Sequence, residues 1–178
     1  KIHIFGPHID NEPLIKSGAY QMNFPNFPVK YTDLPCEIDY NELSPGEMTL
    51  PGGVHVNFMY INHKLPTFGY RISYQDKSVA TCFDHEPYTN ILNNKQQDYN
   101  QDECVKLTQQ LASFYYNADL LIHDAQFTTE EYKNSFYNWG HSSYEVAVKN
   151  AILAKVKRLL FFHHDLSRTD KMLDELDK

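Results

Sequence analysis

Histidine and aspartate residues recur directly after the apolar segments of this chain, at four places along the sequence. They occur in Asn62-His63, Phe83-Asp84-His85-Glu86, Gly140-His141-Ser142-Ser143 and Phe162-His163-His164-Asp165. Strand ends can deliver such side chains into one cleft, and imidazole nitrogen combined with carboxylate oxygen suits zinc or manganese better than magnesium or calcium. The pattern therefore predicts strands whose ends build a metal centre, as in a metallohydrolase.

The size and composition of the chain predict one globular domain over residues 1–178. Its 178 residues are 42% hydrophobic, which is enough to bury a core. The three cysteines form no C-x-x-C pair, so we expect neither disulfides nor a thiolate zinc site, and a reducing, cytoplasmic setting. No apolar run reaches the roughly 20 residues that span a bilayer. The net charge of −7 argues against long nucleic acid as a partner.

Hydrophobic patterning predicts strands in the first half of the chain and alternating helices and strands in the second. Strands are expected over 1–5, 36–40, 54–61, 67–74 and 78–83, with a hairpin at Asp76-Lys77 and a proline-rich region with one short helix over 7–34. Later elements are a helix over about 101–117, a strand over 120–123, a helix with a Ser142/Glu145 capping box, a strand over 158–162 and a helix over 168–177. This order predicts a layered α/β fold.

Several of the singled-out residues also have an ordinary structural explanation. His63 fits a solvated loop histidine, and Asp84 fits an Asx turn at a strand end. His123-Asp124 could form a buried ion pair, or could orient a liganding imidazole through a hydrogen bond. None of these positions decides the function alone.

The two later histidine positions are more informative. His141 precedes the N-terminus of a predicted helix, where the helix dipole and unpaired N–H groups favour an anion such as phosphate. His163 and His164 follow an apolar strand. Adjacent strand residues point to opposite faces, so at most one of this pair should face a given cleft.

Three segments of the second half carry a specific resemblance to a known family. They are 118–125, with Ile122-His123-Asp124, then 140–143, and 158–165; upstream, 61–86 continues the likeness. In their order and in their amino-acid sequences, these segments resemble the C-terminal portion of metallo-β-lactamase-fold phosphodiesterases, closest to the ribonuclease Z and phosphoribosyl cyclic phosphodiesterase group. The resemblance covers nearly the whole chain and implies the αββα sandwich of this fold, without its N-terminal part.

The resemblance also implies a role for each residue. His63 would ligate one metal ion, Asp84 would bridge two, and His164, preferred to His163, would ligate the other. His141 would be catalytic, contacting the phosphoryl oxygens. The residues that would support these side chains through hydrogen bonds are His123, Asp124 and His163. The implied cofactors are two divalent metal ions, with zinc preferred and manganese as the alternative.

One part of the family's pattern is missing. Its first metal-binding motif, His-x-His-x-Asp-His, occurs nowhere in this sequence. The chain begins without an initiator methionine inside an alternating apolar segment, so we expect the motif upstream of Lys1; a degenerate member of the family is the other reading. The reaction implied for a protein that has the motif is hydrolysis by a hydroxide shared between two metal ions.

The expected substrate is a small phosphodiester, such as a cyclic nucleotide or a cyclic sugar phosphate, because the chain is acidic. Six aromatic residues could wall a pocket and stack on a base, or simply pack beneath loops: Tyr20, Phe24, Phe27, Tyr31, Tyr137 and Trp139. A homodimer is common in the family. Two alternatives stay open, namely hydrolysis of an ester, lactone or thioester on the same fold, and a non-catalytic domain.

Overall fold

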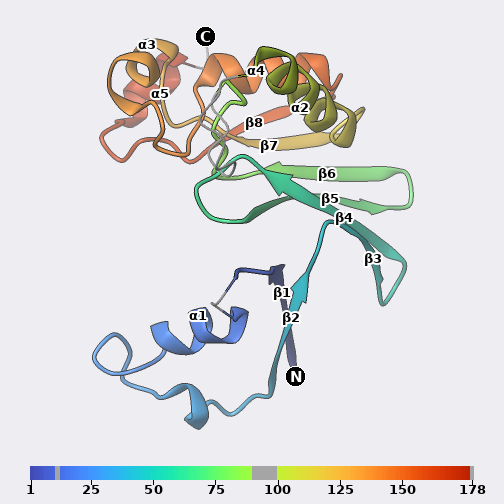
Figure 1. The fold of residues 1–178 in the computed structure, drawn as a ribbon, viewed down its shortest axis with the longest axis vertical. Helices are drawn as coiled ribbons and strands as arrows, with labels where there is room; N and C mark the ends of the chain where they lie inside the picture. Colours follow the sequence, from blue (N-terminus) through green and yellow to red (C-terminus); the bar gives the residue numbers. More distant parts are fainter. Residues whose placement is uncertain (11–12, 90–99, 177–178) are drawn as a thin grey trace. The chain divides into compact units, whose positions relative to one another are not determined.

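A six-stranded mixed sheet organises most of the chain in the computed structural model, which describes residues 1–10, 13–89 and 100–176 (Figure 1). Its strand order is β3-β4-β5-β6-β7-β8. The bounds are Gly46–Leu50 for β3, Val54–Ile61 for β4, Thr67–Tyr74 for β5, Lys77–Cys82 for β6, Leu120–Asp124 for β7 and Leu159–Phe162 for β8. β4, β5 and β6 pair antiparallel, whereas β6, β7 and β8 pair parallel. The C-terminal ends of the last three strands therefore share one edge of the sheet.

Helices pack on this sheet and bury its apolar side chains. The helices are α2 (Gln101–Phe114), α3 (Thr129–Glu131), which continues into a π-helical turn over Tyr132–Phe136, α4 (Tyr144–Leu153) and α5 (Asp170–Leu176). The main core joins Ala80 and Leu121 of the sheet to Leu111 of α2 and Ala151 of α4. Small residues in this core, such as Ala80 and Ala151, let α4 pack closely on β7 and β8.

Contacts divide the chain into two compact units, Lys1–Gly46 and Glu47–Lys178, and the single domain that we predict over 1–178 stays a prediction. In the first unit, β1 (Ile2–Pro7) pairs parallel with β2 (Ile38–Leu43). The unit also contains α1 (Leu14–Gln21) and a 3-10 turn over Tyr31–Asp33. A side chain at Gly18 would meet the Tyr40 hydroxyl, so the absence of a Cβ allows α1 to lie close to β2.

Most predicted elements are present with small shifts at their ends. The strands over 54–61 and 67–74 have the predicted bounds, and β5 and β6 form the predicted hairpin. The strand over Gly46–Leu50 was not predicted. The predicted Ser142/Glu145 capping box is wrong by one residue, because the Ser143 hydroxyl caps α4 by accepting from Val146 N–H. The Glu145 carboxylate instead accepts from the backbone N–H of Thr129.

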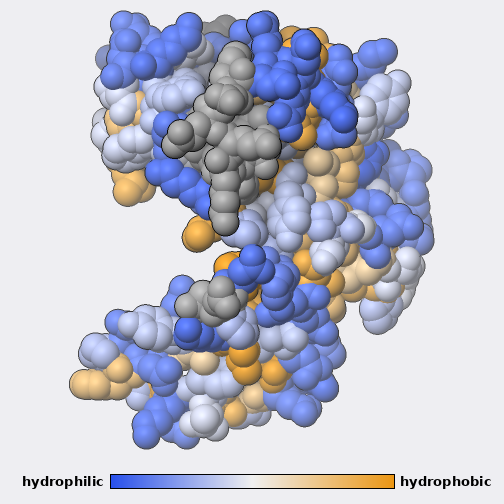
Figure 2. Space-filling view, in the orientation of Figure 1, coloured by the Kyte–Doolittle hydropathy of each residue, from blue (hydrophilic) through white to orange (hydrophobic). Residues whose placement is uncertain are grey.

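The surface agrees with the acidic, polar composition. Figure 2 shows hydrophilic residues over much of the visible face, with apolar residues interspersed among them. Within the described part of the chain, no helix combines the length and the apolar character needed to cross a membrane.

Candidate metal centre

Asp84, His141 and His163 form a group whose potential ligand atoms all lie within 4.8 Å of one another. Asp84 follows β6, His163 follows β8, and His141 lies in the loop before α4. Nε2 of His163 is 3.4 Å from Oδ1 of Asp84, and the His141 and His163 rings stack with centroids 4.4 Å apart. The Asp84 side chain is 41% exposed, so solvent reaches the group. The parallel strands thus bring together residues that lie far apart in the sequence.

The backbone at this edge of the sheet is unusual. Asp84 has a φ of 38° and His163 a φ of 61°, both in the left-handed region that L-residues rarely occupy. Such conformations persist only where the surrounding structure holds them, and they concentrate at functional sites. The left-handed residues redirect the chain directly after β6 and β8, which aims both side chains at His141.

His141 is paired with a buried aspartate. Its Nδ1 lies 2.7 Å from Oδ2 of Asp124, whose side chain is fully buried. Burial alone would lower the pKa of His141, but the hydrogen bond to Asp124 and the charges of Asp124 and Asp84 raise it above its ordinary value overall. In either charge state, a proton on Nδ1 allows this nitrogen to donate to the Asp124 carboxylate.

The Asp124 carboxylate also binds three backbone N–H groups. His85 N–H donates to Oδ2 at 3.0 Å, while Gln126 and Ser142 N–H donate to Oδ1 at 3.2 and 3.3 Å. One buried carboxylate therefore links the loop after β6, the loop after β7 and the segment that carries His141. This position agrees with the supporting role that we predict for Asp124.

His63 lies beside the group but is not among its three members. Its ring centroid is 6.0 Å from that of His141. Nδ1 accepts from the Leu65 N–H at 3.3 Å, so a neutral His63 ring carries its proton on Nε2. Burial, the largest influence, lowers its pKa. Ligation of a metal through Nε2 requires this hydrogen bond to change, and the ligand role of His63 stays a prediction.

The structure differs from the sequence prediction at the adjacent histidines after β8. His163 belongs to the group with Asp84, whereas Nδ1 of His164 lies 3.0 Å from the hydroxyl of Tyr144 on α4, and the two rings stack. Only one of the pair faces the candidate centre, as expected, but it is His163. The resemblance favoured His164 because it falls where the family's last histidine does, whereas the left-handed backbone at His163 directs that side chain toward Asp84. The ligand role of His164 stays a prediction.

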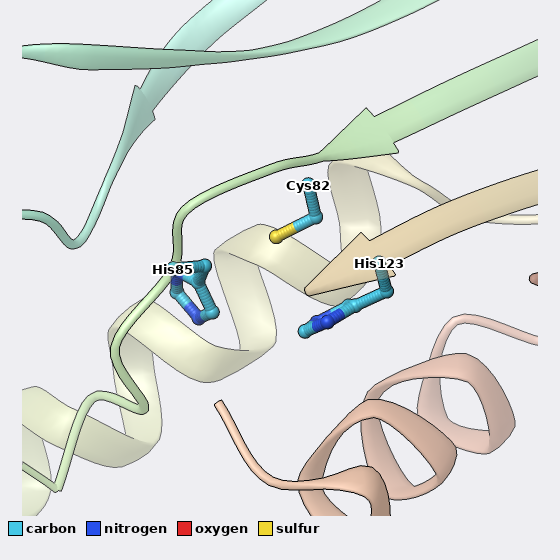
Figure 3. Close-up of side chains that lie close together, drawn as sticks. All are labelled: Cys82, His85 and His123. Atoms are coloured by element: carbon cyan, nitrogen blue, oxygen red, sulfur yellow. The ribbon is translucent and has the colours of Figure 1, made fainter. Parts of the chain in front are cut away.

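A second, fully buried group consists of Cys82, His85 and His123 (Figure 3). Cys82 and His123 are paired across β6 and β7, and His85 approaches from the following loop. Nδ1 of His123 donates to the Asp124 carbonyl at 2.7 Å, and Nε2 accepts from the Asn150 amide at 3.1 Å. Among the described residues, His123 contacts the Asp124 carbonyl and Asn150 but neither His141 nor Asp84, and its supporting role stays a prediction.

This buried group is a poor cage for a metal ion. Both nitrogens of His123 already have partners. Nδ1 of His85 accepts from Asn62 N–H at 3.3 Å, which places the proton of the neutral ring on Nε2. Burial lowers the pKa of both imidazoles and raises the pKa of the Cys82 thiol. The raised pKa favours a neutral Cys82 thiol over the thiolate that binds a metal ion.

The half-buried group, by contrast, fits a divalent metal ion. Asp84 and His163 supply a carboxylate and an imidazole, which are donors suited to zinc or manganese, and His141 lies beside them. Nδ1 of His163 is buried and has no hydrogen-bond partner among the described residues. The Asp124–His141 pair repeats the carboxylate–histidine arrangement that orients ligands in metal sites.

Two residues near the group were not predicted. Glu86 is fully buried and accepts hydrogen bonds from the backbone that carries His141. Gly140 has a φ of 95°, and a Cβ there would lie 2.8 Å from Cδ2 of His63. The Asp84-His85-Glu86 run indicates possible metal ligands. No sequence pattern indicates that Glu86 would bind the backbone of residues 138–141.

Known proteins resemble this chain in sequence and in fold. No family model matches the sequence. The curated ribonuclease Z of Prochlorococcus marinus strain MIT 9515 is 26% identical over 178 aligned residues, covering 83% of this chain and 55% of that protein. The ribonuclease Z of strain MIT 9301 is 26% identical over 148 residues, covering 66% of this chain and 47% of that protein. The chain thus spans about half the length of the curated relatives it matches.

Solved structures show the same fold. The metallo-β-lactamase fold protein YhfI from Bacillus subtilis matches with a TM-score of 0.58 at 16% identity, covering 98% of this chain and 57% of that chain. The short form of human tRNase Z matches with a TM-score of 0.56 at 18% identity, covering 92% of this chain and 61% of that chain. These matches confirm the predicted fold. The chain is therefore a metallo-β-lactamase-fold protein that lies near ribonuclease Z in sequence.

Proposed function

We propose that this protein is a metal-dependent hydrolase that acts on phosphodiesters. The observation that carries the proposal is the convergence of Asp84, His141 and His163 at the shared edge of β6, β7 and β8. The sequence relatives named ribonuclease Z support the phosphodiester, and so does a structural neighbour described as a diphosphatase of the PhnP family, with a TM-score of 0.53.

Asp84 and His163 are the residues that we assign to metal binding, with His63 as a further ligand. One structural neighbour is a Zn(2+)-bound PqqB from Methylobacterium extorquens, which supports zinc as the metal. When bound, divalent ions activate water and polarise a phosphoryl oxygen. The exposure of Asp84 leaves this side of the group accessible to a substrate.

His141 is the residue that we assign to the phosphoryl group. Because Nδ1 donates to Asp124, Nε2 is the ring nitrogen left to face Asp84 and His163. The protonated ring donates a hydrogen bond from Nε2 to a non-bridging phosphoryl oxygen, where negative charge increases in the transition state. Asp124 holds the ring in this orientation and stabilises its positive charge.

The substrate that we propose is a small phosphodiester, a cyclic nucleotide or a cyclic sugar phosphate. The net charge of −7 disfavours a long polyanion. Trp139 lies two residues before His141 with 58% of its surface exposed. Its ring packs edge-on against Phe136, with the ring centroids 5.1 Å apart. An exposed indole held from one side can stack on a base.

The test compares substrates with the zinc-loaded protein. Bis(p-nitrophenyl) phosphate should be hydrolysed faster than a thioester or a lactone, and His141→Ala should reduce turnover far more than zinc content. Faster cleavage of either carboxylic substrate would reject a phosphodiesterase, and no cleavage of any of the three would favour a non-catalytic domain. Equal losses of zinc and turnover in His141→Ala would make His141 a metal ligand instead.

A further inference from the structure

Glu86 is a carboxylate buried two residues after Asp84. Its side chain has no exposed surface, and hydrogen-bond donors surround both oxygens. Oε1 accepts from the Tyr132 hydroxyl and from Asn138 N–H at 3.2 Å. Oε2 accepts from Gly140 N–H at 2.6 Å and from His141 N–H at 3.1 Å. Three of the four donors therefore belong to one short segment, residues 138–141.

Burial imposes a free-energy cost on the Glu86 carboxylate and on the N–H groups that bind it. A buried carboxylate is costly unless hydrogen bonds replace its lost hydration, and buried N–H groups equally require acceptors. Burial and the Glu86 carboxylate raise the pKa of Tyr132, so its hydroxyl stays protonated and donates. All four donors are thus satisfied by one side chain, and no other acceptor for the N–H groups of Gly140 and His141 is recorded among the described residues.

The connection joins two parts of the candidate centre. Glu86 N–H itself donates to the Asn62 carbonyl at 2.7 Å, which fixes the carboxylate's own backbone next to His63. Its side chain then holds Gly140, whose Cα approaches the His63 ring, and His141, whose ring stacks on His163. Asp124 restrains the His141 ring, whereas Glu86 restrains the His141 backbone.

We propose that Glu86 is a positioning residue, which fixes the 138–141 segment against the Asp84 loop and so sets where the His141 ring lies. Among the described residues, Glu86 contacts neither Asp84 nor His163, so its positional effect acts through the segment it holds. Its charge also raises the pKa of His141. The expected effect of Glu86 on turnover rests on the proposed function. The expected effect of Glu86 on the 138–141 backbone is independent of that function.

The first experiment needs no substrate. Glu86→Gln replaces one acceptor oxygen by an NH2 group that faces N–H donors, so amide hydrogen exchange at Gly140 and His141 should accelerate by about tenfold or more. Glu130→Gln makes the same chemical change at an exposed position in the neighbouring helix and is the matched control. Unchanged exchange at Gly140 and His141 in Glu86→Gln would overturn the proposal. Should Glu86→Gln fail to fold, Glu86→Asp keeps the charge, shortens the side chain and is judged by the same readout.

Chemical rescue separates positioning from general loss of structure. Glu86→Ala leaves a small space lined by N–H donors, which added formate can fill with a new carboxylate. Formate should restore both the exchange protection and the turnover of this variant, whereas chloride at equal ionic strength should restore neither. Restoration by both salts, or by neither, would count against the assignment.

The kinetic pattern gives a further check with bis(p-nitrophenyl) phosphate. A displaced His141 should lower kcat and kcat/KM together, by about tenfold to a hundredfold in Glu86→Gln, because small misplacements of catalytic groups are this costly. A rise in KM with unchanged kcat would reject a positioning role. If the unmodified protein hydrolyses no phosphodiester, the proposed function fails, while the exchange and formate measurements still decide the role of Glu86.

Discussion

His141 and Asp124 lie 2.7 Å apart, Nδ1 to Oδ2, with Asp124 at the end of β7 and His141 in the loop before α4. The carboxylate is fully buried, whereas the imidazole keeps 15% of its side-chain surface exposed. A buried charge thus acts on a ring that solvent and substrate can reach. The pair explains how a histidine in a loop can hold one orientation.

The pH behaviour of His141 should report this pair in the metal-free protein. Burial lowers the pKa of His141, but the hydrogen bond to Asp124 and the charges of Asp124, Asp84 and Glu86 together raise it above the ordinary value for histidine. Asp124→Asn removes the hydrogen bond and the charge of Asp124 and should lower the pKa of His141. Because the folded pKa exceeds the unfolded one, the pair stabilises the fold below the unfolded pKa and stops doing so as pH rises through the folded pKa. NMR titration of the ring protons measures both variants, and an unshifted His141 in Asp124→Asn would contradict this account.

Replacing the two histidines after β8 one at a time should give opposite results for metal content. His163→Ala removes a member of the candidate centre and should lower bound zinc after dialysis, as measured by mass spectrometry. His164→Ala removes the partner of the Tyr144 hydroxyl and should leave zinc content unchanged. The reverse outcome would restore His164 as the ligand, as the sequence resemblance implied.

Gly140→Ala should be more harmful than the same change at Gly53. Both glycines have left-handed backbone, with φ of 95° and 82°, so both changes carry a strain of about 1–3 kcal/mol. Only at Gly140 does a Cβ also meet another residue, at 2.8 Å from Cδ2 of His63, whereas nothing lies within 4 Å at Gly53. Urea unfolding should show a larger loss for Gly140→Ala, and NMR shifts of His63 should change only there. Equal losses with an unperturbed His63 would mean that the close approach is unimportant.

Truncating Leu111 should test the core between α2 and the sheet. Leu111 is 1% exposed, and Leu111→Ala should reduce the free energy of unfolding by about 2–5 kcal/mol through lost burial and a residual cavity. Leu166→Ala deletes the same atoms from a fully exposed side chain and should stay within about 0.5 kcal/mol of the unmodified protein. Chemical denaturation of both variants measures the difference. Similar effects at the two sites would contradict the packing described for α2.

Local patterns predicted the strands and the general place of the candidate centre. The bounds of β4 and β5 follow from their apolar residues and from the turns that flank them. Parallel pairing of β6, β7 and β8 then brings Asp84, Asp124 and His163 to one edge of the sheet. This is expected for residues at the C-terminal ends of neighbouring parallel strands. These features depend on short-range sequence patterns, which are visible in a single chain.

Other features depend on backbone conformations and distant contacts that such patterns do not reveal. The choice between His163 and His164 depends on a left-handed residue, for which neither histidine shows a sequence signal. The role of Glu86 depends on Gly140 and His141, which lie more than fifty positions away in the sequence. The sequence alone therefore shows Glu86 only as a further ligand-type residue close to Asp84. The cap of α4 was also mispredicted, because Ser142 and Ser143 are adjacent and the sequence does not show which hydroxyl caps the helix.

The parallel β6-β7-β8 ladder also affects how the protein can fold. Its two connections enclose long stretches of chain, so the three strands can pair only after large loops have closed, and such topologies fold slowly. During synthesis, Asp84 and Asp124 leave the ribosome before β8 exists, and the candidate centre stays incomplete until His163 has been made. An unfinished chain therefore presents the β7 edge unpaired, which makes this edge the place where misassembly with a second copy would begin.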